Sequence, residues 1–421
     1  MSGAKNSVLK LMAAALLAEG TSVLGNVPRI TDVACMAELV ASLGVGYRWC
    51  DPCASPADAK PSGHGPEDLH SSSHGLELDV PAQLHPVAPP ELVESIRASI
   101  VLLGPLLARH GMVEMWMPGG DDFGSRPIDF HLGGLERMGA TFETASGKLV
   151  GRAGRLTGAR LVLEYPSHTA TDNLMMAAVL AKGTTIIENA AREPEVVDLA
   201  EMLVGMGAII DGAGTSRIVI EGVESLKPAC HVVVPDRVEA ATLLAAVGLA
   251  GGEVMVEGPR AEHMDMLLEK LNTMGVHTVA EEGGLLAVSD GRLHCVDIAT
   301  LPYPGVATDY KPLLVTMLSV ADGVSIVTEN LFSGRFRYIE ELRTLGADIR
   351  TEGHHAVVRG VARLRGATVR ASDIRAGAAL VLAGLAATGE TTVLGGDHID
   401  RGYEDLAGKL ASLGADVRRE P

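Results

Sequence analysis

The sequence has few aromatic residues, few cysteines and no long apolar run. Aromatic side chains make up 3% of the 421 residues while 47% are hydrophobic, so we expect cores packed from aliphatic side chains. The 5 cysteines are odd in number and irregularly spaced, which indicates a reducing compartment and not a disulfide framework. No apolar segment reaches the roughly 18 residues of a membrane helix, and residues 9–17 lack the cleavage pattern of a signal peptide. We therefore predict a cytoplasmic protein outside the membrane.

Positive charge is also scarce. The 35 lysine and arginine residues are outnumbered by 53 aspartate and glutamate residues, and the formal net charge is −18. Nucleic acids and anionic membrane surfaces bind to basic protein faces, so we predict neither as a partner. A small anion that binds this protein must therefore meet a local cluster of lysine and arginine side chains.

Internal repetition organises the chain. Residues 11–45 and 173–208 each predict a helix of small residues, a glycine, a β-branched strand, a polar loop and an amphipathic helix. Four further segments follow the same plan and begin with residues 99–111, 241–252, 312–323 and 379–389. Helices often end in a left-handed glycine. We expect this of the glycines that close the first helices, Gly20, Gly111, Gly183, Gly252, Gly323 and Gly389, and the second helices, Gly44, Gly139, Gly207, Gly275, Gly346 and Gly414.

Six repeats of this kind predict two α/β domains of three units each. We expect the first domain at residues 5–234 and the second at residues 235–421, with residues 1–4 at the hinge. No feature of the sequence indicates a large oligomer, and we expect a monomer or a weak oligomer.

The first repeat is longer than the others by an insertion at residues 50–75. Its richness in Pro, Ser, Gly and His is typical of a surface loop. The alternative is a zinc site, although the spacing of its ligands fits no standard zinc pattern. The residues that this alternative would use are Cys50, Cys53, His64, His70 and His74. We favour the loop and predict no metal site.

One short stretch is hard to explain as scaffold. Residues 118–131 read PGGDDFGSRPIDFH and crowd glycines, two aspartates and an arginine between apolar segments. This stretch is one of several motifs that occur in order along nearly the whole chain. The motifs are SGAKN (2–6), RASI (97–100), GGD and GSRPID (119–129), NAAREPE (189–195), PDR (235–237), TD (308–309), RF (335–336), SDIRA (372–376) and HIDRGYE (398–404).

In these motifs the chain resembles the enolpyruvyl transferases of the EPSP synthase superfamily, and among them most of all the UDP-N-acetylglucosamine 1-carboxyvinyltransferases. The resemblance implies two inside-out α/β barrel domains, each of three pseudo-symmetric βα repeats, with the active site in the interdomain cleft. The family usually has a strand before SGAKN. Since this sequence begins almost at that motif, either the second domain lacks an outer strand or the true start lies upstream.

The resemblance implies transfer of the enolpyruvyl group of phosphoenolpyruvate (PEP) to an acceptor hydroxyl, with release of phosphate and without a cofactor or metal. Arginine and lysine hold such a small anion by charge-assisted hydrogen bonds. By the resemblance, Lys5, Arg126 and Arg401 take the phosphate, and Arg335 and Arg375 lie near the carboxylate. Asn6 is counted with the PEP site and, like Arg97, is expected close to the acceptor.

Three aspartates are candidates for the proton transfers of the reaction. Asp121 stands where many relatives carry a reactive cysteine that donates a proton to C3 of PEP. Exclusion of water would raise the pKa of this carboxyl, and the loss of the thiol predicts resistance to fosfomycin. Asp309 matches the residue that contacts the acceptor hydroxyl and is the candidate base, and Asp373 is a candidate for proton traffic. Asp122 is better explained as a solvated turn residue.

The acceptor is expected to be a uridine nucleotide, because residues 126–130 match the loop that reads uracil in relatives. Ser167-His168-Thr169 replaces Ser-Val-Gly and Ser333-Gly334 replaces Glu-Asn or Glu-Ala, which favours a remodelled site. We therefore favour the 3′-hydroxyl of UMP in nucleoside antibiotic biosynthesis, with UDP-N-acetylglucosamine of peptidoglycan synthesis as the alternative and a non-catalytic nucleotide-binding protein as a remote one. The expected acceptor contacts are Arg97, Arg126, Pro127, Ile128, Asp129, Phe130, Tyr165, Ser167, His168, Thr169, Asp309 and Leu331.

Overall fold

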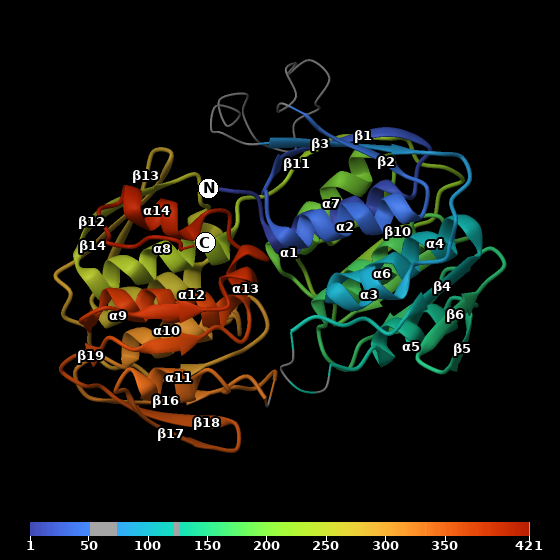
Figure 1. Ribbon diagram of the computed structural model, residues 1–421. Helices are drawn as coiled ribbons and strands as arrows, with labels where there is room; N and C mark the ends of the chain where they lie inside the picture. Colours follow the sequence, from blue (N-terminus) through green and yellow to red (C-terminus); the bar gives the residue numbers. More distant parts are fainter. Residues whose placement is uncertain (51–73, 122–123, 125, 333, 421) are drawn as a thin grey trace. The chain divides into compact units, whose positions relative to one another are not determined.

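The computed structural model describes residues 1–50, 74–121, 124, 126–332 and 334–420 (Figure 1). By contacts the chain divides into two units. The N-terminal unit comprises residues 2–120 and 127–234, and the C-terminal unit comprises residue 1, residues 121–126 and residues 235–421. The sequence motif at 118–131 is therefore shared, because residues 121–126 group with the C-terminal unit although we expected them in the first domain.

Three buried helical segments begin the repeats of the N-terminal unit. They are α1 (Lys5–Ala15), the 3-10 helix η2 (Arg97–Leu102) that leads into α4 (Leu103–His110), and α6 (His168–Ala178). Small and aliphatic residues dominate these segments, so they pack closely, with η2 against α1 and α6 against both η2 and α4. The other helices of this unit are α2 (Thr31–Ser42), α3 (Pro90–Ser95), α5 (Asp129–Arg137) and α7 (Pro194–Gly205).

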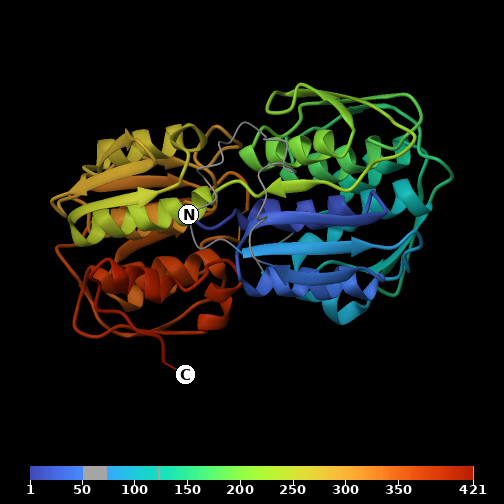
Figure 2. The same cartoon turned by 90° about the horizontal axis from the view of Figure 1, so that it is seen from above.

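Three sheets complete the N-terminal unit. Their strands are β1 (Gly20–Val27), β2 (Gly46–Cys50), β3 (His74–Val80), β4 (Met112–Trp116), β5 (Thr141–Ala145), β6 (Lys148–Arg152), β7 (Arg160–Val162), β8 (Thr184–Glu188), β9 (Ile209–Asp211), β10 (Arg217–Glu221) and β11 (Cys230–Val232). The strand orders are β11-β1-β3-β2, which Figure 2 shows, β4-β6-β5 and β7-β8-β10-β9. Pairing is antiparallel except for β1 with β11 and β7 with β8.

The C-terminal unit repeats the plan with α8 (Arg237–Ala250), α10 (Lys311–Leu318) and α12 (Ile374–Leu385) as its buried helices. Each of the three packs against the other two, and Figure 1 shows them one above another. The other helices are η3 (Ala261–His263), α9 (Asp265–Met274), α11 (Ile339–Thr344), α13 (Gly396–Asp400) and α14 (Leu406–Ser412). None of the helices in the described residues of either unit is long and apolar enough to span a membrane.

The sheets of the C-terminal unit are regular in two repeats and reduced in the third. The strands are β12 (Gly252–Glu257), β13 (His277–Glu281), β14 (Gly284–Ser289), β15 (Ile298–Ala299), β16 (Val324–Thr328), β17 (Asp348–Glu352), β18 (His355–Arg359), β19 (Leu364–Arg365), β20 (Thr368–Arg370), β21 (Ala387–Thr388) and β22 (Thr392–Leu394). The larger sheets have the orders β12-β14-β13 and β15-β16-β18-β17. In the sixth repeat the strands form only the parallel pairs β19-β21 and β20-β22.

The glycines predicted to end helices test the repeat assignment directly. All twelve have a positive φ, from 68° at Gly111 to 115° at Gly323. Side chains rarely adopt that backbone conformation, which is why glycine recurs at these positions. The prediction that every one of them ends a helix was wrong for Gly20, Gly183, Gly323 and Gly389, because α1, α6, α10 and α12 end four or five residues earlier. The repeats and a mixed α/β fold are confirmed, whereas the description of each domain as a closed barrel stays a prediction.

The bounds predicted for the insertion at 50–75 were too wide, because Cys50 is the last residue of β2 and residues 74 and 75 are the first two of β3. The alternative zinc site needs Cys53, His64 and His70, which lie outside the described residues. Among the residues that the structure does describe, no group of three His, Cys, Asp or Glu side chains could hold a metal ion.

Candidate active site

The glycines that open the 118–131 stretch have a local structural reason. A Cβ atom on Gly119 would lie 1.9 Å from the carbonyl oxygen of Glu94, so no other residue fits there. Gly120 has a φ of 91°, which a larger residue would adopt only with strain. These glycines therefore fix the path of the backbone into Asp121. Close packing at Gly119 and backbone conformation at Gly120 thus account for the choice of glycine at both positions.

Asp121 forms an ion pair with Arg401, which follows α13. The Asp121 side chain is 7% exposed and that of Arg401 is 17% exposed, so the pair is largely removed from water. The Nδ1 atom of His398 lies 3.9 Å from the same carboxylate oxygen. The predicted proton donor and a predicted phosphate ligand are therefore partners of each other in this structure.

Arg126 lies half-buried within the electrostatic reach of the same pair. Burial lowers the pKa of its guanidinium, and Arg335 and Arg401 lower it further. Asp121 and Asp309 act in the opposite direction, but they do not compensate fully. Arg126 therefore lies among two other guanidinium groups and two carboxylates, and burial is the main cause of its lowered pKa.

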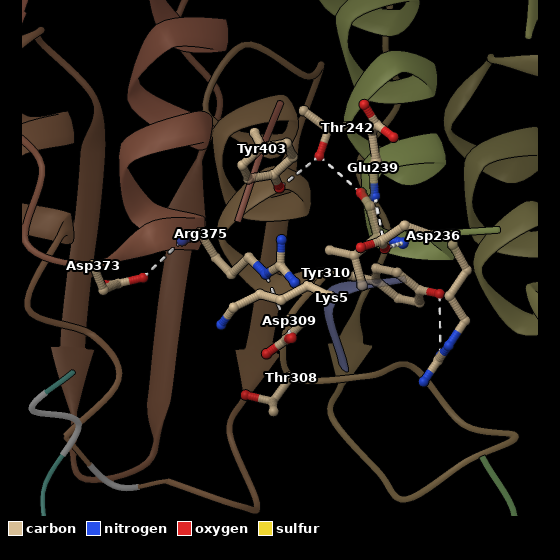
Figure 3. Close-up of polar contacts among 12 residues, drawn as sticks. Lys5, Asp236, Glu239, Thr242, Thr308, Asp309, Tyr310, Asp373, Arg375 and Tyr403 are labelled. Carbon is tan, nitrogen blue, oxygen red and sulfur yellow. Dashed lines mark hydrogen bonds and ion pairs between the residues drawn. The ribbon is translucent and has the colours of Figure 1, made fainter. Parts of the chain in front are cut away.

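Asp309 forms ion pairs with two buried arginines, Arg335 and Arg375, and Figure 3 shows the pair with Arg375. Its Oδ1 accepts a hydrogen bond from Arg335 Nη2 at 2.7 Å, and its Oδ2 lies 3.5 Å from Arg375 Nε. Arg335 and Arg375 are 3% and 4% exposed, whereas the carboxylate is 24% exposed. Two guanidinium groups thus hold one carboxylate in a fixed orientation with part of its surface open.

We call these residues together the arginine cluster: Arg126, Arg335, Arg375, Arg401, Asp121 and Asp309. Two carboxylates pair with three of its guanidinium groups, since Arg401 pairs with Asp121 and both Arg335 and Arg375 pair with Asp309, and Arg126 lies within electrostatic reach of both carboxylates. The whole cluster belongs to the C-terminal unit. In a protein with net charge −18, such an excess of buried positive charge fits a small anion that carries several negative charges.

Asp373 stabilises the start of a helix. Its Oδ1 accepts hydrogen bonds from the backbone N–H groups of Arg375 at 3.0 Å and Ala376 at 2.9 Å, so it caps the N-terminus of α12 (Figure 3). The cap fixes the first turn of the helix that carries Arg375. A role in proton traffic stays a prediction.

The predicted residues of the N-terminal unit lie near helix starts. Lys5 begins α1 and pairs with Asp32 at 2.9 Å, and Asn6 follows it, half-buried. Arg97 begins η2 and its Nη1 donates to the carbonyl of Pro118 at 2.9 Å, which ties η2 to the motif. In the rest of the segment predicted to read uracil, Pro127 and Ile128 precede α5, which begins at Asp129. Ile128 is buried, Phe130 is half-buried, and Pro127 and Asp129 are exposed.

Thr169 is held by the buried His131. Burial lowers the pKa of His131 to about 3, and Arg97 adds to the shift, so the ring is neutral. Its Nε2 lies 3.3 Å from Thr169 Oγ1, and its Nδ1 lies 2.9 Å from Asn173 Nδ2. The hydroxyl that replaces a glycine of relatives thus has a partner inside the unit.

His168 is engaged in the same way, in a group that we call the lysine–histidine cluster: Lys10, His168 and Asp172. Lys10 Nζ lies 2.8 Å from Asp172 Oδ2 and 2.5 Å from His168 Nε2. Burial raises the pKa of Asp172 to about 7, and Glu193 and Glu195 contribute, although Lys10 opposes them. Ser167 caps α6 by accepting from Ala170 N at 3.4 Å, and Tyr165 is 37% exposed.

Sequence analysis missed a buried ion pair behind the arginine cluster. Lys311 and Glu329 lie 2.9 Å apart and both side chains are 0% exposed. Burial lowers the pKa of Lys311 to about 8. A lysine within the apolar segment YKPLLVTML was the available signal, but a charged residue there is usually exposed. Leu331, which was predicted to contact the acceptor, donates its N–H to Glu329 Oε1 at 2.8 Å and so lies beside this ion pair. Asp122 and Ser333 lie outside the described residues.

Comparison with known proteins gives a consistent result. A family model described as EPSP synthase (3-phosphoshikimate 1-carboxyvinyltransferase) matches residues 1–52 and 69–410. The chain is 48% identical over 417 residues to a UDP-N-acetylglucosamine 1-carboxyvinyltransferase of Nocardia farcinica (strain IFM 10152), covering 99% of this chain and 94% of the relative. The protein of that name from Myxococcus xanthus (strain DK1622) is 46% identical over 419 residues, covering 100% and 95%.

Solved structures agree with the family match. The enolpyruvyl transferase NikO from Streptomyces tendae superposes with a TM-score of 0.85 at 27% sequence identity, covering 99% of this chain and 94% of that chain. An EPSP synthase from Acinetobacter baumannii has a TM-score of 0.70 at 19% identity, covering 100% and 97%, and it supports the fold alone.

Proposed function

The chain belongs to the EPSP synthase family and is an enolpyruvyl (carboxyvinyl) transferase, and we propose that it moves the enolpyruvyl group of PEP to a hydroxyl of UDP-N-acetylglucosamine. Phosphate is the other product. The observation that carries the donor half of this proposal is the arginine cluster, in which four guanidinium groups lie near two carboxylates. PEP brings a phosphate and a carboxylate, and guanidinium groups bind both by charge-assisted hydrogen bonds.

The aspartates of the cluster supply the proton transfers. Asp309 accepts the proton of the acceptor hydroxyl while that oxygen attacks C2 of PEP, and Asp121 protonates C3. The C2–O bond to phosphate then breaks, C3 loses a proton, and the double bond is restored in the product. Arginine contacts stabilise the negative charge of the departing phosphate.

The ion pair of Asp121 with Arg401 supports a link between donor binding and acid function. A phosphate that binds Arg401 competes with Asp121 for the same guanidinium. Once the phosphate has taken that place, Asp121 no longer has its cationic partner, and its carboxyl is better able to hold and deliver a proton. Donor binding thereby prepares the acid.

For the acceptor, we now favour the sugar nucleotide over UMP, which we had preferred from the sequence. The relatives with that activity in their names are 46–48% identical to this chain over nearly its full length. The substitutions that had suggested a remodelled site also have internal partners, since His168 contacts Lys10 and Thr169 contacts His131. These contacts weaken the argument that the two side chains block an acceptor.

UMP remains the second candidate. The observation that favours it is the chemical difference between His168-Thr169 and the Val-Gly pair expected from the family resemblance. Phosphate release from PEP, measured with each acceptor separately, tests the choice. We expect kcat/KM to be higher with UDP-N-acetylglucosamine, and turnover with UMP alone would reverse the assignment.

A further inference from the structure

Lys311 is a fully buried cation that the proposed chemistry does not use. It stands at the first residue of α10, where the helix dipole disfavours positive charge. Its Nζ pairs with Glu329 Oε2 at 2.9 Å and lies 3.9 Å from the centre of the Phe336 ring. Buried ion pairs contribute little net stability compared with apolar side chains, so this placement points to another role.

The ion pair holds Arg335 at two separate points. Lys311 Nζ donates a hydrogen bond to the backbone carbonyl of Arg335 at 2.6 Å. On the other side, Arg335 Nη1 donates to Thr308 Oγ1 at 3.0 Å, and Thr308 Oγ1 donates to Glu329 Oε2 at 2.7 Å. A closed ring of polar contacts therefore runs from Lys311 through Glu329 and Thr308 to the guanidinium and backbone of Arg335.

Glu329 extends this ring to the neighbouring loop. Its Oε1 accepts from Thr300 Oγ1 at 2.8 Å and from the N–H groups of Leu331 at 2.8 Å and Phe332 at 3.2 Å. The carboxylate thus orders the backbone that leads into Arg335 as well as the hydroxyl that holds its guanidinium. Each of these contacts needs an ionised carboxylate or a hydrogen-bond acceptor at this position.

We propose that Lys311, through Glu329 and Thr308, is a positioning residue that fixes the Arg335 guanidinium for PEP and for Asp309. The inference rests on the proposed function in taking Arg335 as a ligand of the PEP carboxylate. With its backbone and its Nη1 both held, Arg335 presents Nη2 to Asp309 at 2.7 Å in a single orientation. A preorganised guanidinium binds an anion without first losing conformational freedom.

Because Lys311 can lose its proton, its positioning role predicts a dependence of PEP affinity on pH. The ionisable groups that face it are Glu329 and Arg335, with Asp373 acting from α12 and Tyr338 beside the Phe336 ring. Burial lowers the pKa of Lys311 to about 8, so the ammonium is lost as the pH rises through that value. PEP affinity should therefore decline above about pH 8.

The experiment is calorimetric titration of PEP into wild type, Lys311→Met and Lys270→Met, from pH 6.5 to 9.5. Lys270 is a matched control because its Nζ donates to the carbonyl of Asp297 at 3.0 Å on the exposed surface of the same unit. We expect Lys311→Met to weaken PEP binding about tenfold at pH 7, near 1.4 kcal/mol, and to lose the alkaline decline. Lys270→Met should keep both the affinity and the decline.

Two further variants separate positioning from general stability. In an Arg335→Ala background, Lys311→Met should weaken PEP binding by less than about twofold more, because interacting residues are not additive. In Glu329→Gln, Lys311 loses the opposite charge that raises its pKa, so the alkaline decline should begin at lower pH. Thermal denaturation midpoints of all variants show whether each is folded.

The outcomes discriminate this inference from the proposed function. Wild-type affinity in Lys311→Met, full additivity with Arg335→Ala, or an unmoved decline in Glu329→Gln would each overturn the role of Lys311. A wild type that binds PEP with the expected pH dependence but transfers it to neither nucleotide would leave that role standing and refute the transfer reaction. A wild type that binds no PEP would overturn both.

Discussion

The two buried charged clusters of this protein differ in balance. The arginine cluster of the C-terminal unit combines four guanidinium groups with two carboxylates. The lysine–histidine cluster of the N-terminal unit combines one ammonium and one imidazole with one carboxylate, whose pKa burial raises to about 7. The first has an excess of charge that an anion can neutralise. In the second, Lys10 contacts both Asp172 and His168 within the N-terminal unit, so it supports the fold and the orientation of His168.

The largest expected effect comes from the acid of the arginine cluster. Asp121→Asn keeps the size of the side chain but cannot donate a proton, so turnover should fall by about 10² to 10⁴. Asp121→Cys should stay active, because a thiol can donate a proton. Activity measured by phosphate release checks both variants. An Asp121→Asn enzyme with near-normal turnover would remove Asp121 from the chemistry.

The same position decides the response to an electrophile. Fosfomycin is an epoxide that a thiolate opens readily, and a carboxylate is a much weaker nucleophile. Intact-protein mass spectrometry after fosfomycin treatment should show an adduct on Asp121→Cys and none on wild type. An adduct on wild type, or none on the variant, would contradict the role assigned to this residue.

The next largest effect on kcat/KM is expected from the arginines that bind the phosphate. Arg401→Ala or Arg126→Ala removes a charge-assisted partner of the phosphate and should lower kcat/KM by about 10² to 10³. Arg155→Ala is the control, since this arginine forms an exposed ion pair with Glu224 and should be unaffected. If all three variants kept wild-type kinetics, the anion would bind elsewhere.

A smaller effect is expected in the balanced cluster. The double variant His168→Val with Thr169→Gly restores the residues of relatives and should change the kcat/KM ratio of UDP-N-acetylglucosamine to UMP by less than about tenfold. The reason is that both native side chains have internal partners. A change of a hundredfold or more would show that these residues select the acceptor after all.

The smallest effect is on stability. The pKa of Asp172 is raised from 3.8 to about 7 by burial, so the folded protein binds a proton that the unfolded chain has already released between these values. Its contribution to stability should therefore decrease as the pH rises from about 4 to about 7. Melting curves of wild type and Asp172→Asn should diverge across this range in favour of the variant, and parallel curves would contradict the shift.

The sequence could predict the parts of this protein that follow local rules. Glycines repeat along the chain, and all twelve positions predicted from them have a positive φ, although four of them lie beyond the end of the helix that they were expected to close. The arginines of the cluster lie in sequence motifs near helix ends. The family resemblance alone was enough to predict them as ligands of PEP. The weak strands of the sixth repeat were harder, because pairs of two or three residues such as β19 with β21 carry almost no periodic signal.

The burial of charged side chains and their pairing over long sequence distances could not be predicted from the sequence. Asp121 and Arg401 are 280 residues apart in the chain, and no local pattern joins them. The burial of Lys311 was not predicted, since side chains that contact it, such as Glu329 and Phe336, come from other segments. His168 and Thr169 were expected to alter the acceptor site, because the sequence does not show that Lys10 and His131 engage them.

The most direct test of the central claim is calorimetric binding of PEP to wild type, Arg126→Ala and His168→Val under the same conditions. The claim is that the arginine cluster, and not the lysine–histidine cluster, receives the anion. We predict that His168→Val binds PEP as wild type does, whereas Arg126→Ala loses about a hundredfold in affinity. Equal binding by wild type and Arg126→Ala, or a comparable loss in His168→Val, would contradict the account.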